Sequence, residues 1–214
     1  MGLDIHADQQ SQLLTYLTLI QKWNQVYNLT SVRDPAEMLT HHLLDSLAVI
    51  PPLRRHLRVW PAGHPSIRVL DVGSGAGLPG TVLAIVCPEL DVTCVDTVAK
   101  KVAFIQNTAI TLKLPNLRGT HARVQELQAA PFDVVTSRAF SSLEDFVSLT
   151  RFHVKQVSGV WLAMKGKHPA DELAVLPKDV DVFHVEPLHV PGLEAERCLV
   201  WMRTVGAALA ADFR

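Results

Sequence analysis

The sequence predicts an α/β fold, with a mostly parallel seven-stranded sheet, helices on both faces and an N-terminal helical segment in front. Three observations lead to this fold class. From residue 67 onward, short apolar segments alternate with helical stretches, which is typical of a parallel sheet covered by helices. A glycine-rich turn follows the first apolar segment. Before residue 51, apolar residues recur at helical spacing.

Two helices are expected at the start of the chain. Apolar residues recur every three or four positions over residues 8–28, which is typical of an amphipathic helix. Asp34 can cap a second helix, with Pro35 in its first turn and Glu37 where a capping-box partner belongs. The proline pair at 51–52 is expected to end this helix.

The region that follows is expected to be a linker. Residues 51–66 contain several prolines and a glycine, which favour an irregular chain. A chain of 214 residues can bury one sizeable core but hardly two. We therefore assign residues 1–60 to an N-terminal helical extension packed on the core and residues 61–214 to the main domain, together one compact unit.

The alternating part of the chain predicts five parallel strands and then a hairpin. The segments near 180–190 and 196–204 are strand-like, and the turn between them is too short for a crossover helix, so they should pair antiparallel. The parallel strands are expected at 67–72, 91–96, 116–122, 132–137 and 158–165, with helices near 79–87, 98–113 and 142–154.

Composition limits the partners and the environment. The formal net charge is −1, so no global positive field attracts nucleic acid, and contact with RNA would rely on local basic patches. Cys87, Cys94 and Cys198 are odd in number and lie in apolar runs, which indicates buried reduced thiols rather than disulfides or a metal site. The sequence has no signal-peptide pattern and no apolar run of roughly 18 residues, so a cytoplasmic protein without a membrane segment is expected.

The sharpest local signal is the glycine loop, residues 72–80 (VGSGAGLPG), which joins the first strand to a helix. Glycines permit positive φ and close approach of the backbone to a ligand, and the helix N-terminus offers free N–H groups. An ordinary tight turn is the alternative. Gly73, Gly75 and Gly77 at alternate positions disfavour it.

The glycine loop matches two classes of cofactor site. Residues 75–80 fit the G-x-G-x-x-G dinucleotide pattern, which is a weak signal when it occurs alone. Asp71 lies two residues before the first glycine, where a carboxylate can order the loop and lie near a cationic amino-acid moiety but would repel a pyrophosphate. We therefore favour S-adenosylmethionine, with Asp71 and the three loop glycines as cofactor-binding residues.

Two further segments are candidates for contact with an adenosine. Asp96 closes the second strand, where a carboxylate can accept both ribose hydroxyls. Its alternative role is to cap the helix that follows, and the two roles are compatible. Val124 and Gln125 follow the third strand, where an adenine ring would lie, although a polar start to a loop explains them equally well.

Five motifs then occur in order over residues 13–204. They are KWN at 22–24 with YNLTSVRD at 27–34, HLLDS at 42–46, GAGLPG at 75–80, SRAF at 137–140 and MKG at 164–166. Together with the predicted hairpin they resemble the RsmG (GidB) family, bacterial methyltransferases that form N7-methylguanosine in small-subunit (16S) ribosomal RNA.

The resemblance implies a class I methyltransferase (Rossmann-like) fold, with S-adenosyl-L-methionine as cofactor and residues 61–214 as the catalytic domain. The implied partner is 16S ribosomal RNA, within a small subunit or during its assembly, and no obligate protein partner is inferred. The implied cofactor contacts are Gly73, Leu78, Val124, Gln125 and Arg138.

The sequence departs from the family pattern at two positions. Gln125 stands where the family commonly has Glu, which bears on the adenine contact. His41 stands where an Arg usually precedes the next His, which removes one fixed positive charge from an RNA-facing surface.

Arg138 is our candidate catalytic residue. Guanine N7 has a lone pair and no proton to lose, so its methylation needs orientation rather than a strong base. The planar fork of Arg138 can grip the cofactor carboxylate, a phosphate or a guanine edge. The alternative is a structural ion pair with Glu144 or Asp145. Phe140 either stacks on the base or belongs to the core.

Three other functions stay open at this point. They are an NAD(P)-dependent oxidoreductase, a methyltransferase for a small molecule and a non-catalytic RNA-binding module on the same fold. RNA binding would use a local basic face, for which the candidates are Lys165, Lys167, His168, Arg54, Arg55 and Arg58.

Overall fold

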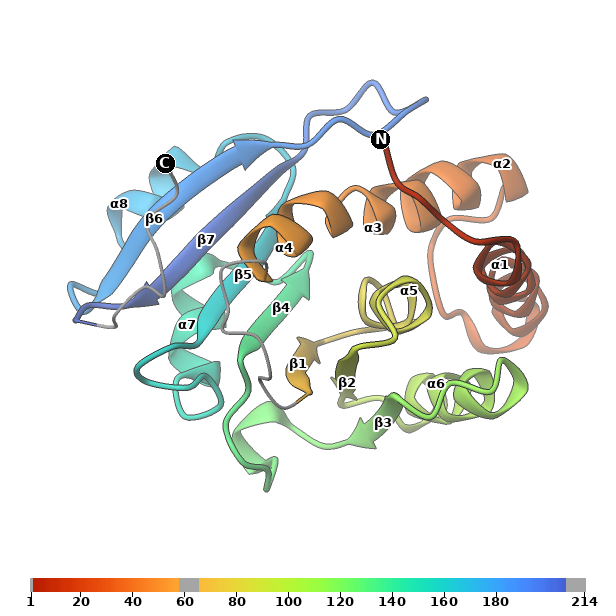
Figure 1. The fold of residues 1–214 in the computed structure, drawn as a ribbon, viewed down its shortest axis with the longest axis horizontal. Coiled ribbons are helices and arrows are strands. Elements are labelled where there is room, and N and C mark those ends of the chain that lie inside the picture. Colours follow the sequence, from red (N-terminus) through yellow and green to blue (C-terminus); the bar gives the residue numbers. More distant parts are fainter. Residues whose placement is uncertain (1, 58–65, 207–214) are drawn as a thin grey trace.

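The computed structural model describes residues 2–57 and 66–206, and a seven-stranded sheet forms its centre (Figure 1). The strands are β1 (Ile67–Val72), β2 (Leu90–Asp96), β3 (Leu117–His121), β4 (Val134–Arg138), β5 (Val160–Lys165), β6 (Val180–Pro187) and β7 (Cys198–Thr204). Their order across the sheet is β3-β2-β1-β4-β5-β7-β6. β7 runs antiparallel to both of its neighbours, and the other neighbouring strands pair parallel.

The predicted strands and the C-terminal hairpin are confirmed, with ends shifted by a few residues. The central strand β1 pairs with β2 and β4, so that Val69 lies opposite Val92 on one side and Val134 on the other. All three valines are fully buried. Helices cover both faces of the sheet, so most side chains of these three strands are buried.

The helices divide between the two faces. α1 (Ala7–Tyr27), α5 (Gly80–Val86) and α6 (Ala99–Thr111) share one hydrophobic cluster with the sheet, whereas α7 (Leu143–Thr150) belongs to a second cluster. In Figure 1 the first three lie together at the right, and α7 and α8 (Ala170–Ala174) lie at the left. The sequence did not predict α8, because its five residues include no buried side chain and so show no apolar period.

The second helix begins as predicted. Asp34 Oδ1 accepts hydrogen bonds from the N–H groups of Ala36 and Glu37 at 2.8 and 3.0 Å and so caps α2 (Pro35–Met38). The chain then continues through a π-helix (Leu39–Leu44), α3 (Asp45–Leu47) and α4 (Ile50–Leu57).

The prediction that the proline pair at 51–52 ends the helical region and opens a linker is wrong for residues 51–57. Both prolines lie in the first turn of α4, where a missing N–H leaves no helical hydrogen bond unmade and the fixed φ of proline suits a helix. Residues 58–65 of the predicted linker lie outside the described residues, as does the predicted domain boundary after residue 60.

The predicted state of the cysteines is confirmed, because Cys87, Cys94 and Cys198 are buried free thiols. Among the described residues, none of the helices is both long enough and apolar enough to cross a membrane.

Candidate active site

The glycine loop turns sharply at the carboxyl end of β1. Gly73 and Gly75 have φ of +65° and +60°, and a Cβ at either position would meet no atom within 4 Å. Gly77 also has positive φ, but a Cβ there would lie 2.4 Å from Thr81 Oγ1. The first two glycines therefore border open space, whereas Gly77 lets the loop pack against α5.

Two aspartates hold the glycine loop in place. Asp96 Oδ2 accepts from the Gly75 N–H and Oδ1 from the Val98 N–H, both at 2.9 Å, so Asp96 supports the loop and the start of α6 together. Asp71 is fully buried beneath the loop and accepts from the Gly80 N–H at 2.8 Å. Burial raises the pKa of Asp71 to about 7. Asp71 thus orders the loop from below.

Tyr16 of α1 is a support of the glycine loop that sequence reasoning missed. Its hydroxyl donates to the Ala76 carbonyl at 2.7 Å, and the Gly77 carbonyl lies 3.2 Å away. Burial holds the pKa of Tyr16 well above its usual value. The helical pattern placed Tyr16 on an amphipathic helix but could not indicate that its hydroxyl reaches a loop sixty residues away in sequence.

A cavity of about 340 Å³, here called the glycine-loop cavity, opens at the carboxyl ends of β1, β2 and β3. It brings together Gly73, Asp96, Val124 and Gln125, which sequence reasoning assigned to a cofactor from separate segments. Phe140 also lines this cavity and packs on Phe146 with ring centroids 5.5 Å apart. Further lining residues that the sequence did not single out are Val72, Val95, Thr97, Val98, Lys101, Ala122, Arg123 and Leu149.

The remaining predicted cofactor residues do not line the glycine-loop cavity. Asp71, Gly77 and Leu78 lie beneath or within the glycine loop and do not line the glycine-loop cavity. Gly75 borders open space through its backbone. Arg138 lines a second cavity, described next.

The second cavity, the arginine cavity, has a volume of about 520 Å³. It joins the N-terminal helical segment to the carboxyl ends of β4 and β5 and to the turn before β7. Ala139 lines this cavity, whereas the next residue, Phe140, lines the glycine-loop cavity, so the chain after β4 separates the two. The lining residues are Thr30, Ser31, Val32, His41, His42, Asp45, Arg138, Ala139, Met164, Lys165, Gly166 and Arg197.

Arg138 forms an ion pair, as the structural alternative expected, but with Asp45, which sequence reasoning did not consider as its partner. Its Nη1 donates to Asp45 Oδ2 at 3.1 Å and to the His41 carbonyl at 2.8 Å. The proposed pairing with Glu144 or Asp145 is wrong. Asp145 instead accepts from the Ser141 hydroxyl at 2.8 Å.

His42 is an uncharged member of the arginine cavity. Burial and the nearby Arg138 guanidinium lower the pKa of His42 to about 4, and its Nε2 lies 2.9 Å from Thr30 Oγ1. His42 therefore stays neutral at physiological pH and adds no positive charge beside the arginines.

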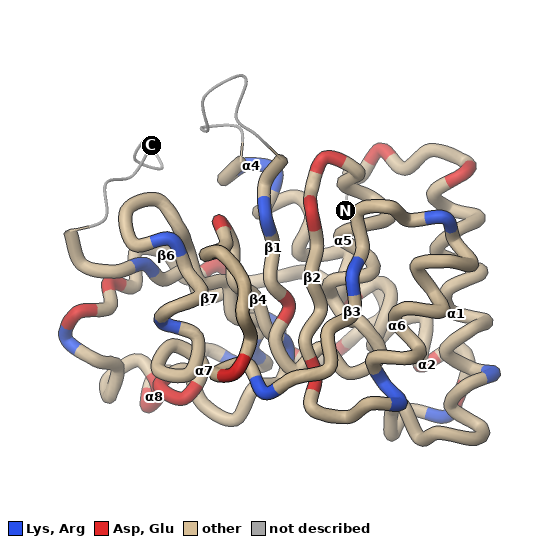
Figure 2. The backbone as a smooth tube through the Cα atoms, turned by 90° about the horizontal axis from the view of Figure 1, so that it is seen from below, with Lys and Arg blue, Asp and Glu red and all other residues tan. Residues whose placement is uncertain are grey.

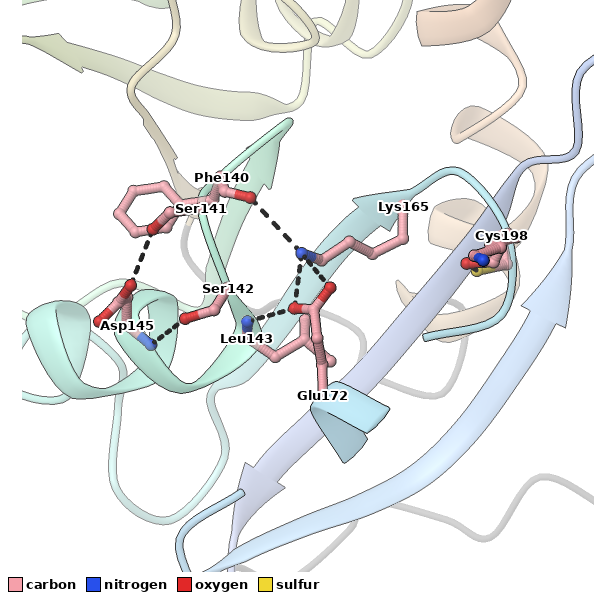
Figure 3. A network of polar contacts seen from close by, with 9 residues as sticks. Phe140, Ser141, Ser142, Leu143, Asp145, Lys165, Glu172 and Cys198 are labelled. Carbon is pink, nitrogen blue, oxygen red and sulfur yellow. Dashed lines mark hydrogen bonds and ion pairs between the residues drawn. The ribbon is translucent and has the colours of Figure 1, made fainter. Parts of the chain in front are cut away.

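Lys165 and Glu172 brace the chain between the two cavities (Figure 3). Lys165 Nζ lies 2.7 and 3.0 Å from the Glu172 carboxylate oxygens and 3.4 Å from the Phe140 carbonyl. Glu172 also accepts from the Leu143 N–H at the start of α7, at 2.7 Å. The two side chains thus hold both ends of residues 140–143, and the charge of Lys165 is already paired.

The predicted basic face is not assembled as one surface. Lys165 lies at the carboxyl end of β5. Arg54 lines a cavity with Ile67, the first residue of β1, and so lies at the opposite, amino-terminal end of the parallel strands. Arg55 pairs with Glu186 at 2.5 Å. Arg58 lies outside the described residues. Figure 2 shows basic and acidic positions interspersed along the chain.

This combination of sheet order, glycine loop after β1 and carboxylate at the end of β2 defines a class I (Rossmann-like) methyltransferase fold. A family model described as "GidB: rRNA small subunit methyltransferase G" matches residues 9–200. The chain therefore belongs to this family.

Curated relatives agree with this assignment. The chain is 64% identical to ribosomal RNA small subunit methyltransferase G of Acidovorax sp. (strain JS42), covering 96% of this chain and 91% of that protein. The protein of the same name from Paracidovorax citrulli is 61% identical, covering 99% and 89%.

Solved structures share the fold at low sequence identity. A SAM dependent methyltransferase from Aquifex aeolicus superposes with a TM-score of 0.57 at 16% identity, covering 87% of this chain and 97% of that one. A mutant of MtNAS in complex with S-adenosylmethionine gives a TM-score of 0.59 at 12% identity, covering 92% and 76%. These likenesses support the fold class.

Proposed function

We propose that this protein uses S-adenosylmethionine to methylate guanine N7 in 16S ribosomal RNA of the small subunit. The observation that carries the proposal is the pair of cavities on either side of residues 139–140, one beside the glycine loop and one lined by arginines, in a member of this family. The names of the relatives support the RNA as substrate. The base and the atom rest on the resemblance of the motifs.

The residues of the glycine-loop cavity suit the adenosine of the cofactor. Gly73 and Gly75 border open space, where any side chain would intrude on a ligand. Asp96 offers carboxylate oxygens at the end of β2, and Val124 and Gln125 offer an apolar and a polar surface for adenine. When bound, the cofactor supplies an electrophilic methyl group on a sulfonium.

The residues of the arginine cavity suit the acceptor base and the amino-acid end of the cofactor. Guanine N7 is nucleophilic without deprotonation, so neutral His42 and the paired carboxylate of Asp45 need not act as bases. Arginine donors could hold a phosphate or guanine O6, but N7 itself must stay free of a donor. The chain thus has to orient the guanine and exclude competing hydrogen bonds.

Transfer of radiolabelled methyl from S-adenosylmethionine tests the proposal. The substrates are small ribosomal subunits, naked 16S rRNA and total metabolites from a strain that lacks the gene, followed by nucleoside analysis. Label in N7-methylguanosine is expected, and the two RNA forms show whether an assembled subunit is required.

A matched pair of variants controls this experiment. Arg138→Ala should abolish labelling, whereas Arg203→Ala should retain it, because Arg203 pairs with Asp181 in the β6–β7 hairpin. Label in metabolites alone would rule out the RNA substrate, and label in another nucleoside would rule out N7.

We place the reaction in the cytoplasm, where small subunits assemble.

A further inference from the structure

The carboxylate of Asp45 lies between two arginines from distant parts of the chain. Arg138 Nη1 donates to Oδ2 at 3.1 Å, and Arg197 Nε donates to Oδ1 at 2.9 Å. Asp45 itself is only 2% exposed. We propose that Asp45, held by Arg197, is a positioning residue that orients the Arg138 guanidinium toward the carboxylate of the cofactor. This inference rests on the proposed function and on the contact between Arg138 and the cofactor that the resemblance to the family implies.

Arg138 lies beside the glycine loop. β1 and β4 pair in register, with Asp71 opposite Thr136, and the Ser137 hydroxyl donates to the Val72 carbonyl at 2.9 Å. Arg138 is the next residue of β4, as Gly73 is the next residue after β1. A cofactor whose adenosine lies in the glycine-loop cavity therefore directs its amino-acid end toward Arg138.

The contacts of Arg138 leave part of its guanidinium for a ligand. In the described part of the chain, its side-chain hydrogen bonds to Asp45 and to the His41 carbonyl are both made by Nη1. A guanidinium has five N–H donors in one rigid plane, so fixing Nη1 fixes the directions of Nε and Nη2 as well. Two donors in a fixed plane match a carboxylate in bidentate geometry.

The helix that carries Asp45 is shaped to make these contacts. The Asp45 N–H donates to the Thr40 carbonyl, five residues earlier in the chain. This spacing is that of a π-helix, and it continues the π-helix (Leu39–Leu44) that precedes Asp45. π-helical turns are rare and occur frequently at functional sites. Here the turn supplies both acceptors of Arg138, the His41 carbonyl and the Asp45 carboxylate.

The local charge explains why a carboxylate is needed. His42 is neutral and Lys165 is paired with Glu172, so Asp45 is the counter-charge for Arg138 and Arg197 together. Without it, two guanidinium ions would repel each other and Arg138 would lose its fixed plane. With it, the pair keeps one net positive charge for an anionic ligand.

The test compares two ligands that differ in the amino-acid end. S-adenosylhomocysteine carries the carboxylate and 5′-methylthioadenosine does not. In titration calorimetry, Asp45→Asn should weaken S-adenosylhomocysteine by about tenfold or more, and leave 5′-methylthioadenosine within about twofold of wild type. Asp181→Asn is the matched control, because Asp181 accepts from Arg203 Nε at 2.8 Å outside the site, and it should change neither affinity.

Two outcomes would overturn the inference. Unchanged binding of S-adenosylhomocysteine to Asp45→Asn would show that Arg138 needs no such partner. An equal loss for both ligands would show that Asp45 acts on the whole fold. If the wild type bound neither ligand, the proposed cofactor site itself would fail.

A second variant keeps the test decisive if Asp45→Asn does not fold. Arg138→Lys retains the charge but cannot span Asp45 and a bidentate ligand, so it should show the same selective loss. Equal affinity ratios for the two ligands in Arg138→Lys and wild type would exclude the proposal.

Discussion

At the scale of single residues, the glycines of the glycine loop have different structural roles. Gly73 and Gly77 both have positive φ, yet only Gly73 borders open space, whereas Gly77 faces Thr81 Oγ1. The sequence predicts both as cofactor residues, because the spacing of glycines reports the turn and not the direction that each residue faces. Packing around the loop decides which glycine meets a ligand.

Alanine substitution should separate these two roles. Gly73→Ala should lower the free energy of unfolding by about 1 kcal/mol, the strain of an L-residue at positive φ, and weaken S-adenosylhomocysteine binding at least about tenfold. Gly77→Ala adds a steric clash and should cost about 2–4 kcal/mol. Urea denaturation and calorimetry measure both.

The clash has its own control. Adding Thr81→Ala to Gly77→Ala removes the oxygen 2.4 Å from the new Cβ and should recover part of the lost stability. Equal destabilisation by the two single variants would contradict the assignment of separate roles.

At the scale of elements, the apolar pattern identifies α1 and part of the face that it buries, because Leu13, Leu17 and Ile20 are buried. The apolar residues that recur at helical spacing over residues 8–28 also include Leu14 and Val26, yet the side chains of these two residues are 59% and 70% exposed. Tyr16, outside that pattern, is 1% exposed and bonds to the glycine loop. Periodicity therefore predicts a helix, whereas a hydrogen bond to a distant loop depends on tertiary packing, which local spacing does not encode.

Tyr16→Phe should test the contact between α1 and the glycine loop. The variant keeps the buried ring and loses the bond to the Ala76 carbonyl, so stability should fall by about 1–2 kcal/mol. Cofactor affinity should fall too, because the loop loses a support. Thermal unfolding with and without S-adenosylhomocysteine measures both, with the more exposed Tyr27→Phe as control. An unchanged affinity would mean that the loop is rigid without α1.

At the scale of the whole molecule, the sheet follows from the sequence more completely than the site does. Strands such as β1 and β4 belong to short segments that alternate with helical stretches, and the glycine loop follows β1 while Asp96 ends β2, so the order of these features along the sequence predicts where they lie. The arginine cavity is different. Asp45, Arg138 and Arg197 come from three separate segments, and Arg197 is one arginine in a turn, with no local pattern to mark it.

Buried histidines should govern the response of the whole molecule to acid. His56 packs on Trp201 with ring centroids 4.8 Å apart, and burial lowers the pKa of His56 from 6.5 to about 4. The unfolded chain therefore binds a proton below about pH 6.5 that the folded chain does not, so stability falls as the pH drops toward 4. His42 acts in the same direction.

His56→Phe keeps a ring in the core and removes the titration. Between pH 7 and pH 5 it should lose about 2 kcal/mol less stability than the wild type. Urea denaturation at the two pH values measures the difference, and the exposed His168→Asn should behave as wild type. If His56→Phe kept the wild-type pH dependence, His56 would be excluded as a cause.

Asp71 acts in the opposite direction. Because burial raises its pKa to about 7, its contribution to the stability of the folded chain is lost as the pH rises from about 4 to 7.

The position of β7 in the sheet has a consequence for synthesis on the ribosome. β7 is the last strand along the described chain, yet it lies inside the sheet, between β5 and β6. β6 emerges first and has no neighbour in the sheet until β7 pairs with it. Arg197, just before β7, completes the arginine cavity at the same step. The nascent chain can therefore assemble the glycine-loop half of the site well before it can build the half that holds Asp45 from both sides.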